Sequence, residues 1–372
     1  MSKIKIGIVG CGNISGVYLG VCKNFEDIEI IACSDIIMER AIARAKEFGV
    51  PKACTVEELM ADPEIEIVLN LTTPLAHAEV ALKALEAGKS VYNEKPLAVT
   101  REDGQKILQL AKAKGLRVGC APDTFLGGGI QTCRKLIDDG WIGEPVAAVA
   151  FLAHHGHESW HPDPEFYYKI GGGPMLDMGP YYLTTLVSLL GPVKRVTGMA
   201  KLSFSERIIT SQPKYGTKIK VEVPTHISGV MEFTNGTMAT MITSFDVWGA
   251  QLPHTGQLPH IEIYGSEGSL SVPNPNNFGG QVSILRAGSK EWKEVPLTHG
   301  YTDQNRGIGV ADMAKAMKTG RPHRANGEMA YHVLDIMHAF HDSSSQGKHI
   351  ELKSTCLRPA ALPIGLRDGK LD

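Results

Sequence analysis

The sequence predicts an α/β protein of two domains, a doubly wound parallel sheet followed by an α/β domain with an open, mostly antiparallel sheet. A glycine-rich turn follows a short apolar run near the N-terminus, and strand-like and helix-like runs then alternate as far as residue 121. Such alternation is typical of parallel sheets. Beyond it, longer strand-like runs separated by turn residues indicate antiparallel pairing. We therefore expect one domain over residues 1–121 and a second over 122–372.

Size and composition support this division and exclude several classes of protein. The chain has 372 residues, more than the ~250 to 300 at which a single core usually stops growing. Its 38 basic and 40 acidic side chains nearly balance, so nothing favours nucleic acid or an anionic membrane as a partner. No apolar run approaches ~20 residues, and the first is too short for a signal peptide. Seven scattered cysteines without a C-x-x-C pair indicate reduced, buried thiols and hence a cytoplasmic protein.

The first expected strand, residues 4–9, leads into a turn with the spacing G-x-G-x-x-x-G and then into a helix. Glycine is needed in such a turn because the backbone must approach a pyrophosphate closely. The helix N-terminus behind it offers unpaired N–H groups and the positive end of a dipole. Taken alone, the glycine pattern is equally compatible with a merely structural turn. The residues expected to hold a dinucleotide here are Gly10, Gly12, Asn13 and Ile14.

An aspartate follows the second expected strand, which covers residues 28–33. Asp35 lies 23 residues after Gly12, where a carboxylate can hold the ribose 2′- and 3′-hydroxyls of a dinucleotide. The alternative is an exposed loop aspartate. The first basic residue after it is Arg40, so a 2′-phosphate would face an acid without a guanidinium partner. The sequence therefore favours NAD over NADP.

Helices and strands are expected to alternate through the rest of the first domain. The expected helices cover residues 39–48, 77–87 and 100–114, and the expected strands cover 65–71, 90–92 and 117–120. Gly88 and Gly115 are placed to end two of these helices, because glycine readily adopts the left-handed conformation that follows a last helical turn.

Two short motifs make the pattern specific. Thr72-Thr73-Pro74 and Glu94-Lys95-Pro96 each follow a strand, and together with the glycine turn they resemble the Gfo/Idh/MocA family over essentially the whole chain. The resemblance implies a Rossmann domain, a mostly antiparallel α/β domain and hydride transfer between a nicotinamide cofactor and hydroxyls of sugars, inositols or related compounds. It also implies that Thr72 and Thr73 line the cofactor cleft, that Glu94 contacts the nicotinamide-side ribose and that Lys95 lies between nicotinamide and substrate. Burial and nearby positive charge are expected to lower the pKa of Lys95.

The second domain is expected to be built on long strands. These cover residues 146–151, 196–204, 226–233 and 237–245, and helices are expected over 305–318 and 327–340, followed by a tail. Asn235-Gly236 predicts a two-residue hairpin with a type I′ turn, because both of its central positions need positive φ. The four residues 251–254 recur as 257–260, a duplication expected to extend a loop.

Residues 171–181 resemble the family signature G-G-G-x-x-x-D-x-G-x-H, with Tyr181 at the histidine position. Asp177 and Tyr181 are four residues apart and would share one face of a regular helix, unless Pro180 marks a helix start. Two mechanisms stay open. In one, a Lys95 ammonium helps Tyr181 to accept a proton while Asp177 orients a substrate hydroxyl. In the other, Lys95 is the base and Tyr181 only donates a hydrogen bond.

A histidine-rich run over residues 154–162 precedes this signature. A metal site is not expected, because no H-x-x-x-H or H-E-x-x-H arrangement is present and hydride transfer to NAD needs no metal. We expect a loop that lines a sugar pocket, in which Trp160 stacks on the sugar ring. A histidine of this loop would form hydrogen bonds with sugar hydroxyls, or would take the proton-transfer role of the signature histidine that Tyr181 replaces. An ordered loop with satisfied imidazoles is the alternative. The residues expected at the substrate are Asp123, Thr124, His157, Trp160 and His161.

These features predict an NAD-dependent dehydrogenase acting on a ring hydroxyl or carbonyl of a sugar, cyclitol or glycoside, for example at C3. The catalytic residues would be Lys95, Asp177 and Tyr181. A redox-neutral glycosidase that uses NAD transiently is one alternative, and a non-catalytic NAD-sensing regulator is another. An open sheet needs its second face covered, so a homodimer or homotetramer through the C-terminal sheet is expected.

Overall fold

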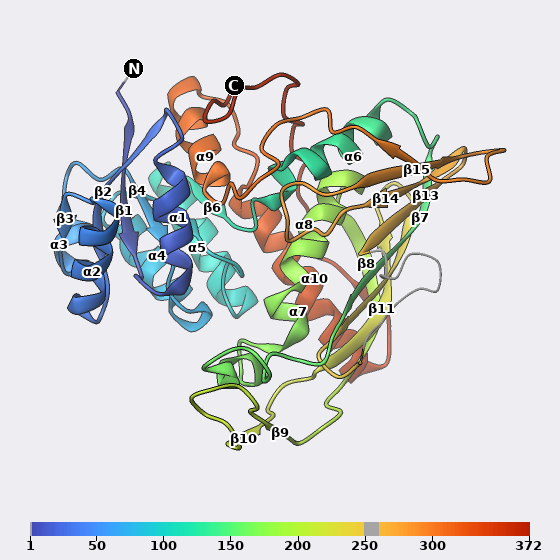
Figure 1. Ribbon diagram of the computed structural model, residues 1–372, viewed down its shortest axis with the longest axis horizontal. Helices are drawn as coiled ribbons and strands as arrows, with labels where there is room; N and C mark the ends of the chain where they lie inside the picture. Colours follow the sequence, from blue (N-terminus) through green and yellow to red (C-terminus); the bar gives the residue numbers. More distant parts are fainter. Residues whose placement is uncertain (1, 249–259) are drawn as a thin grey trace.

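The computed structural model describes residues 2–248 and 260–372, and it separates into an N-terminal and a C-terminal α/β part (Figure 1). The two parts meet along helices α9 (Ile308–Thr319) and α10 (Gly327–Gln346). Of the duplicated segments at 251–254 and 257–260, all but His260 lies outside the described residues.

The N-terminal part is a Rossmann fold with six parallel strands in the order β3-β2-β1-β4-β5-β6. The central β1 (Ile4–Val9) pairs with β2 (Ile28–Ser34) on one side and with β4 (Ile67–Asn70) on the other. The expected strands and helices of this domain are confirmed, with ends that move by a few residues. Sequence analysis missed β3 and α3, which are too short to show a periodic pattern. The remaining elements are β3 (Lys52–Ala53), β5 (Ser90–Asn93), β6 (Val118–Cys120), α1 (Asn13–Cys22), α2 (Met38–Phe48), α3 (Val56–Ala61), α4 (His77–Glu86) and α5 (Arg101–Lys114).

The C-terminal part is built on a nine-stranded sheet in the order β16-β15-β14-β13-β7-β12-β11-β8-β17. Its neighbours pair antiparallel except for β7 and β12, which are parallel, so the predicted mostly antiparallel sheet is confirmed. A separate two-stranded sheet is formed by β9 (Glu206–Ile208) and β10 (Lys218–Lys220). The nine strands are β7 (Pro145–Ala153), β8 (Val193–Lys201), β11 (His226–Phe233), β12 (Met238–Ser244), β13 (Ile261–Gly265), β14 (Gly268–Val272), β15 (Val282–Arg286), β16 (Lys293–Val295) and β17 (Ile350–Glu351).

The hairpin between β11 and β12 is confirmed, but the predicted type I′ turn is wrong. Gly236 has φ +89°, whereas Asn235 is not among the described residues with positive φ. The Gly236 amide donates to the Phe233 carbonyl at 3.0 Å, and the Phe233 amide donates to Thr237 at 2.9 Å. The loop is therefore one residue longer, with an ordinary turn over Thr234 and Asn235 followed by a left-handed glycine.

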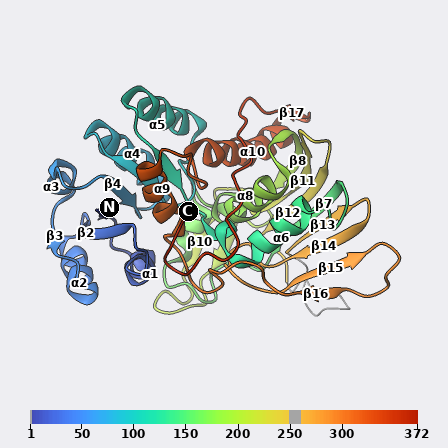
Figure 2. The ribbon, with the colours of Figure 1, turned by 90° about the horizontal axis from the view of Figure 1, so that it is seen from above.

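Helices cover one face of the nine-stranded sheet, between the sheet and the Rossmann domain (Figure 2). They are α6 (Gly128–Asp138), α8 (Gly179–Leu190) and α10. Helix α10 packs closely on the sheet because Gly198 and Gly229 have no side chain. A Cβ at Gly198 would lie 2.6 Å from the Phe340 ring, and a Cβ at Gly229 would lie 2.7 Å from it. In the described residues no helix covers the opposite face, where several apolar side chains are exposed, namely Met199, Val230 and Met238.

The C-terminal helices return to the first domain. Arg117, next to β6, donates to the Ala316 carbonyl of α9 at 3.1 Å, and Gly119 forms a bridge with Asn326 just before α10. Lys318 of α9 pairs with Asp27 at 2.9 Å. A division at residues 121 and 122 therefore stays a prediction, because the chain after residue 307 packs on the first sheet as well as on the second.

Two of the expected general properties can be compared with the structure. All seven cysteines are free and buried, as predicted. None of the helices in the described ranges is both long and apolar enough to cross a membrane.

Candidate active site

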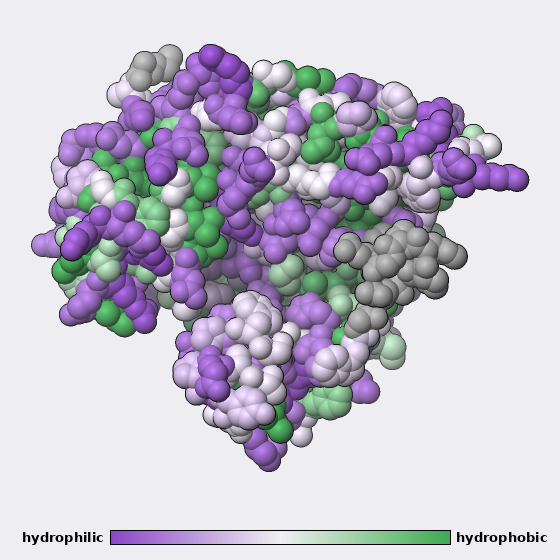
Figure 3. Space-filling model, in the orientation of Figure 1, coloured by the Kyte–Doolittle hydropathy of each residue, from purple (hydrophilic) through white to green (hydrophobic). Residues whose placement is uncertain are grey.

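A cavity of about 1060 Å³ runs along the carboxyl ends of the Rossmann strands and reaches into the second domain. The molecular surface is hollowed between the Rossmann domain and the lobe that carries β9 and β10 (Figure 3). The glycine turn lies at one end and residues 161–181 form part of the other wall. The sequence-predicted residues that line the cavity are Gly10, Gly12, Asn13, Ile14, Asp35, Thr72, Thr73, Glu94, Lys95, His161, Asp177 and Tyr181.

The glycine turn has the geometry that a pyrophosphate requires. Gly10 has φ +102°, and a Cβ there would lie 2.7 Å from the Leu71 carbonyl oxygen. A Cβ on Gly12 would meet nothing within 4 Å, because Gly12 faces the cavity. Gly12 is also the N-cap of α1, and no side chain caps this helix. The Ser15 N–H donates to the Gly12 carbonyl oxygen at 3.3 Å, so the N–H groups of Asn13 and Ile14 at the start of α1 are the ones that can bind the anion.

Asp35 is held at the edge of the same cavity by two backbone amides. Cys11 N–H donates to its Oδ2 at 2.7 Å and Ile37 N–H donates to its Oδ1 at 2.9 Å. A carboxylate offers about four lone-pair sites, so both oxygens can still accept from ribose hydroxyls. Arg40 and Arg44 also line this end of the cavity. The residues therefore fit the adenosine half of NAD.

The two cofactor-side motifs are joined by a histidine that sequence analysis did not single out. The buried ring of His77, at the start of α4, lies 3.0 Å from the Thr72 carbonyl oxygen and 2.6 Å from that of Pro96. It thereby fixes the turn after β4 to the turn after β5. Glu94 is positioned separately, because the Tyr18 hydroxyl donates to its Oε1 at 2.7 Å.

Lys95 crosses the cavity to the second domain. Its Nζ donates to the Asp177 carboxylate at 2.9 Å and to the Asp177 carbonyl oxygen at 2.8 Å, and it lies 5.3 Å from the Tyr181 ring centroid. Burial alone would lower the pKa of Lys95, but Asp177, Tyr181 and Glu94 together raise it above the ordinary value. The prediction of a lowered pKa is wrong, because the nearby charges are negative rather than positive. Lys95 is an ammonium at neutral pH.

Asp177 and Tyr181 do not share a continuous helix. Asp177 ends α7 (Gly173–Asp177), and α8 begins at Gly179 with Pro180 in its first turn. The break follows from Pro180, which has no N–H to continue the helix and is well suited to a first turn. The alternative that Pro180 marks a helix start is confirmed.

Arg306 contacts this end of the cavity through Tyr181, and sequence analysis missed it. The Arg306 Nη2 donates to the Tyr181 hydroxyl at 3.3 Å and to Asn276 Oδ1 at 2.7 Å. Arg306 precedes α9 rather than lying inside the predicted helix 305–318. No spacing rule connects it to Tyr181, from which it is 125 residues distant in sequence.

His157 is buried behind Asp177. Its ring stacks on Tyr167 with centroids 3.8 Å apart and planes 5° apart, and its Nε2 lies 3.6 Å from Asp177 Oδ2. Burial lowers the pKa of His157 to about 4, although Asp177 acts in the opposite direction. The imidazole is therefore neutral at physiological pH and supports the wall of the site.

His157 is expected to make folding sensitive to acid. Between its ordinary pKa of 6.5 and the folded value of about 4, the unfolded chain binds a proton that the folded chain does not. Stability should therefore fall as pH falls through this window, with a contribution from His157 of at most about 3 kcal/mol. Denaturant unfolding at about pH 7 and about pH 4.5 tests this by comparison with His157→Phe, which keeps the stacked ring. An equal loss of stability in both proteins would contradict it.

The other residues expected at the substrate occupy different positions. His161 lines the cavity, whereas Trp160 beside it is 61% exposed and is not on the cavity wall. Asp123 and Thr124 are each 1% exposed and do not line the cavity. Asp123 accepts from the Gly307 and Gly309 amides at 2.8 and 3.0 Å, so it holds the entry to α9. Burial raises the pKa of Asp123 to about 6, against the lowering effect of those two amides.

Metal ligands do not gather in the described parts of the chain. No group of three or more His, Cys, Asp or Glu side chains there has an arrangement that could hold an ion. The histidines near the site are instead engaged with neighbouring rings, as His161 is with Trp160 and Tyr167.

Comparisons with known proteins agree with this architecture. Residues 4–121 match the oxidoreductase family with an NAD-binding Rossmann fold, and residues 130–271 match the GFO/IDH/MocA C-terminal domain. A 1,5-anhydro-D-fructose reductase of Ensifer adhaerens is 30% identical over 271 residues, which cover 71% of this chain and 74% of that protein. An inositol 2-dehydrogenase of Salmonella typhimurium is 32% identical over 167 residues, 44% of this chain and 48% of that protein.

A solved structure agrees in fold across nearly the whole chain. Levoglucosan dehydrogenase in complex with NADH and L-sorbose superposes with a TM-score of 0.78 at 22% identity, covering 95% of this chain and 100% of that one. At this identity the likeness concerns the fold alone, and the family follows from the matched domains and the first relative. The chain belongs to the Gfo/Idh/MocA family and is an NAD-dependent oxidoreductase.

Proposed function

We propose that the protein transfers a hydride between NAD and a ring hydroxyl or carbonyl of a sugar, cyclitol or glycoside, with C3 of a glycoside as one candidate position. The observation that carries this proposal is the contact of Lys95 with Asp177 and Tyr181, at the far end of a cavity that begins at the glycine turn. Relatives named for anhydrofructose, inositol and levoglucosan support the substrate class.

The side chains suggest how the hydroxyl proton is handled. NAD, when bound, would supply the nicotinamide ring that accepts the hydride. The raised pKa of Lys95 means that its ammonium cannot take a proton from the substrate, so it donates to the substrate oxygen and stabilises negative charge there. The hydroxyl proton is proposed to pass to the oxygen of Tyr181, which accepts a hydrogen bond from Arg306 and whose ring lies beside Lys95. Asp177 keeps Lys95 charged and correctly directed.

A substrate screen tests this function. The purified protein would be mixed with NAD and a panel of sugars, inositols and glycosides, with NADH followed by absorbance and products by mass spectrometry. Net NADH together with a keto product is expected. Cleavage of a glycosidic bond without net NADH would replace the dehydrogenase with a redox-neutral glycosidase, and binding of NAD without any turnover would indicate a regulator.

We also propose that the protein is a cytoplasmic homo-oligomer that pairs through the outer face of its nine-stranded sheet. The exposed Met199 on β8 and Val230 on β11 lie on adjacent strands of this face, and the seven unpaired cysteines suit a reducing compartment. A Met199→Glu variant should shift the protein toward monomer in multi-angle light scattering, because it places a charge in an apolar contact. A wild-type monomer at all concentrations would contradict the proposal. Ile42→Glu on α2, whose side chain is also exposed, is the control at a site remote from this sheet.

A further inference from the structure

A second tyrosine, Tyr167, lies at the catalytic end of the cavity, and the proposed proton transfer does not use it. It belongs to the short helix η3 (Pro164–Tyr168) and lines the cavity together with Asp177 and Tyr181. Charges on Asp177, Lys95 and Tyr181 all act on the pKa of Tyr167, so its hydroxyl lies within electrostatic range of these three side chains. No sequence motif contains Tyr167, and sequence analysis missed it.

The ring of Tyr167 is covered on both faces by other rings. His157 stacks on it with centroids 3.8 Å apart and planes 5° apart, and the Phe166 ring lies 4.0 Å away with an interplanar angle of 32°. Two rings this close to one centroid cannot share a face, because they would overlap. The stack therefore fixes the ring plane of Tyr167 and leaves its edge and its hydroxyl for the cavity.

The backbone around Tyr167 is fixed as well. A Cβ on Gly172 would lie 2.4 Å from the Phe166 carbonyl oxygen and 2.7 Å from the nearest atom of Tyr167, its carbonyl oxygen. The chain thus passes directly against the N-cap of α7, the helix that carries the catalytic aspartate. On the other side, the buried Tyr168 donates through its hydroxyl to the Glu158 carboxylate. The position of Tyr167 is therefore set before a ligand arrives, as is usual in ligand pockets.

The Tyr167 hydroxyl is available to a ligand. It makes no hydrogen bond within the described residues, and it is not one of the unpartnered polar atoms there that are sealed from solvent. Burial raises the pKa of Tyr167, Asp177 adds to this effect and Lys95 opposes it. The phenol therefore keeps its proton at neutral pH, so it can both donate and accept a hydrogen bond.

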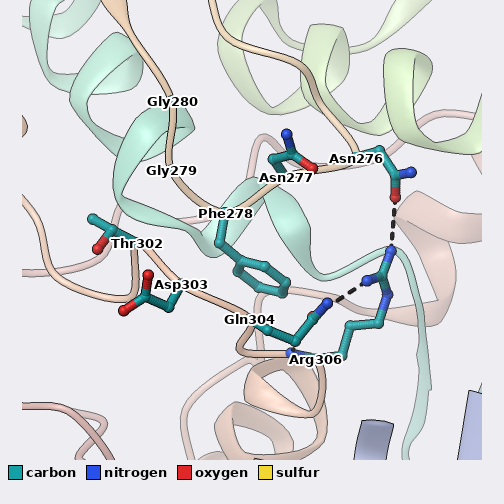
Figure 4. A pocket seen from close by; sticks show the side chains of 9 residues that line it. All are labelled: Asn276, Asn277, Phe278, Gly279, Gly280, Thr302, Asp303, Gln304 and Arg306. Carbon is teal, nitrogen blue, oxygen red and sulfur yellow. Dashed lines mark hydrogen bonds between the residues drawn. The ribbon is translucent and has the colours of Figure 1, made fainter.

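Arg306 is not available for a second contact with the substrate. Its guanidinium donates to Asn276 at 2.7 Å and to Gln304 at 3.2 Å, neither of which lines the catalytic cavity (Figure 4). It reaches the cavity wall only through its hydrogen bond to Tyr181. Tyr167 instead offers a hydrogen-bonding group that is still unused and faces the cavity itself.

We propose that Tyr167 binds the substrate hydroxyl on the carbon next to the reacting carbon, so that the enzyme selects a vicinal diol over an isolated alcohol. This rests on the proposed sugar dehydrogenase function. Sugars and cyclitols carry hydroxyls on neighbouring carbons, and one of these is directed at Tyr167 when the reacting oxygen lies between Lys95 and Tyr181. A site that hydrogen-bonds a substrate hydroxyl discriminates against the analogue that lacks it, because the protein group is then left unpaired.

The test measures kcat/KM for D-glucose, 2-deoxy-D-glucose and 4-deoxy-D-glucose in the wild type and in Tyr167→Phe. The two deoxy sugars each lack one of the hydroxyls next to C3, and phenylalanine keeps the ring stack while removing only the hydroxyl. The wild type should prefer glucose over at least one deoxy sugar by about tenfold, and the variant should lose most of that preference.

The two ratios separate a specific contact from a structural role. A variant in which kcat/KM falls by the same factor for all three sugars would overturn the proposal, as would a wild type without a preference for glucose or a variant that keeps it. Tyr215→Phe is the matched control, because Tyr215 is 68% exposed and does not line the cavity. It should leave all three values unchanged.

Failure of the proposed function is distinguishable from failure of this contact. If none of the three sugars is oxidised, calorimetric titration of the NADH-loaded protein with the same sugars measures the contact directly. Tighter binding of glucose than of a deoxy sugar, with the difference lost in Tyr167→Phe, would support the contact without catalysis. Equal binding of the three sugars, or binding of none, would refute it.

Discussion

A Lys95→Met variant is expected to lose about 10²- to 10⁴-fold in kcat while keeping its affinity for NADH, the range typical of a positioned proton-handling group. The reason is that Lys95 is the only cation that contacts both Asp177 and the Tyr181 ring within the described residues. Methionine keeps the length of the side chain but removes the charge that stabilises the substrate oxygen. Steady-state kinetics with the best substrate, and fluorescence titration with NADH, measure the two quantities.

The same variant should be destabilised, and this effect can be separated from the loss of activity. The side chains of Lys95 and Asp177 are 18% and 14% exposed, so loss of the lysine leaves Asp177 poorly solvated and costs about 2 kcal/mol. Lys95→Met/Asp177→Asn should regain most of that stability without regaining activity. Lys106→Met, whose ion pair with Asp103 is at the surface, is the matched control and should change neither. Full activity of Lys95→Met would remove Lys95 from the mechanism.

An Asp35→Ser variant is expected to lose about 10- to 100-fold in affinity for NAD and to gain affinity for NADP. Hydrogen bonds to a charged group contribute about 1.5 to 3 kcal/mol, which corresponds to that range. Removal of the carboxylate also ends its repulsion of a 2′-phosphate. Arg40 and Arg44 line the same end of the cavity and are within reach of such a group.

Measurement of kcat/KM with each cofactor tests this prediction. Serine keeps an acceptor for the Cys11 amide, so the turn should survive the substitution. The double variant Asp35→Ser/Arg40→Ala tests the role of Arg40. Its kcat/KM with NADP should no longer be raised, and its kcat/KM with NAD should stay low. A wild type that uses both cofactors equally would show that Asp35 does not discriminate.

Much of the site could be predicted from local sequence because its chemistry depends on short segments. The turn at Gly10 and Gly12, the carboxylate of Asp35 and the side chain of Lys95 each follow a short apolar run that predicts a strand. The helices between these strands make the strands parallel. Parallel strands deliver these residues to one edge of a sheet. The sequence therefore predicts that these residues lie close together, and Gly10, Gly12, Asp35 and Lys95 all line the cavity.

Local sequence was least informative where a residue's environment comes from elsewhere in the chain. The predicted lowering of the Lys95 pKa was wrong because Asp177, 82 residues away, supplies a negative charge. The type I′ turn was wrong because pairing of β11 with β12 decides which residues are central. Asp123 follows a strand as Asp35 does, but it is buried under the start of α9 instead of facing the cavity.

The sequence by itself determined the fold class, and it predicted the residues Gly10, Gly12, Asp35 and Lys95 that the structure brings to one cavity. Only the tertiary structure decided which charges surround Lys95, that Arg306 reaches Tyr181 and that Tyr167 lines the same cavity. The physical reason is that hydrogen bonds and electrostatic interactions act over a few ångströms of space, whereas sequence patterns report neighbours along the chain. Contacts between residues separated by 82 or 125 positions exist only after both domains have packed together.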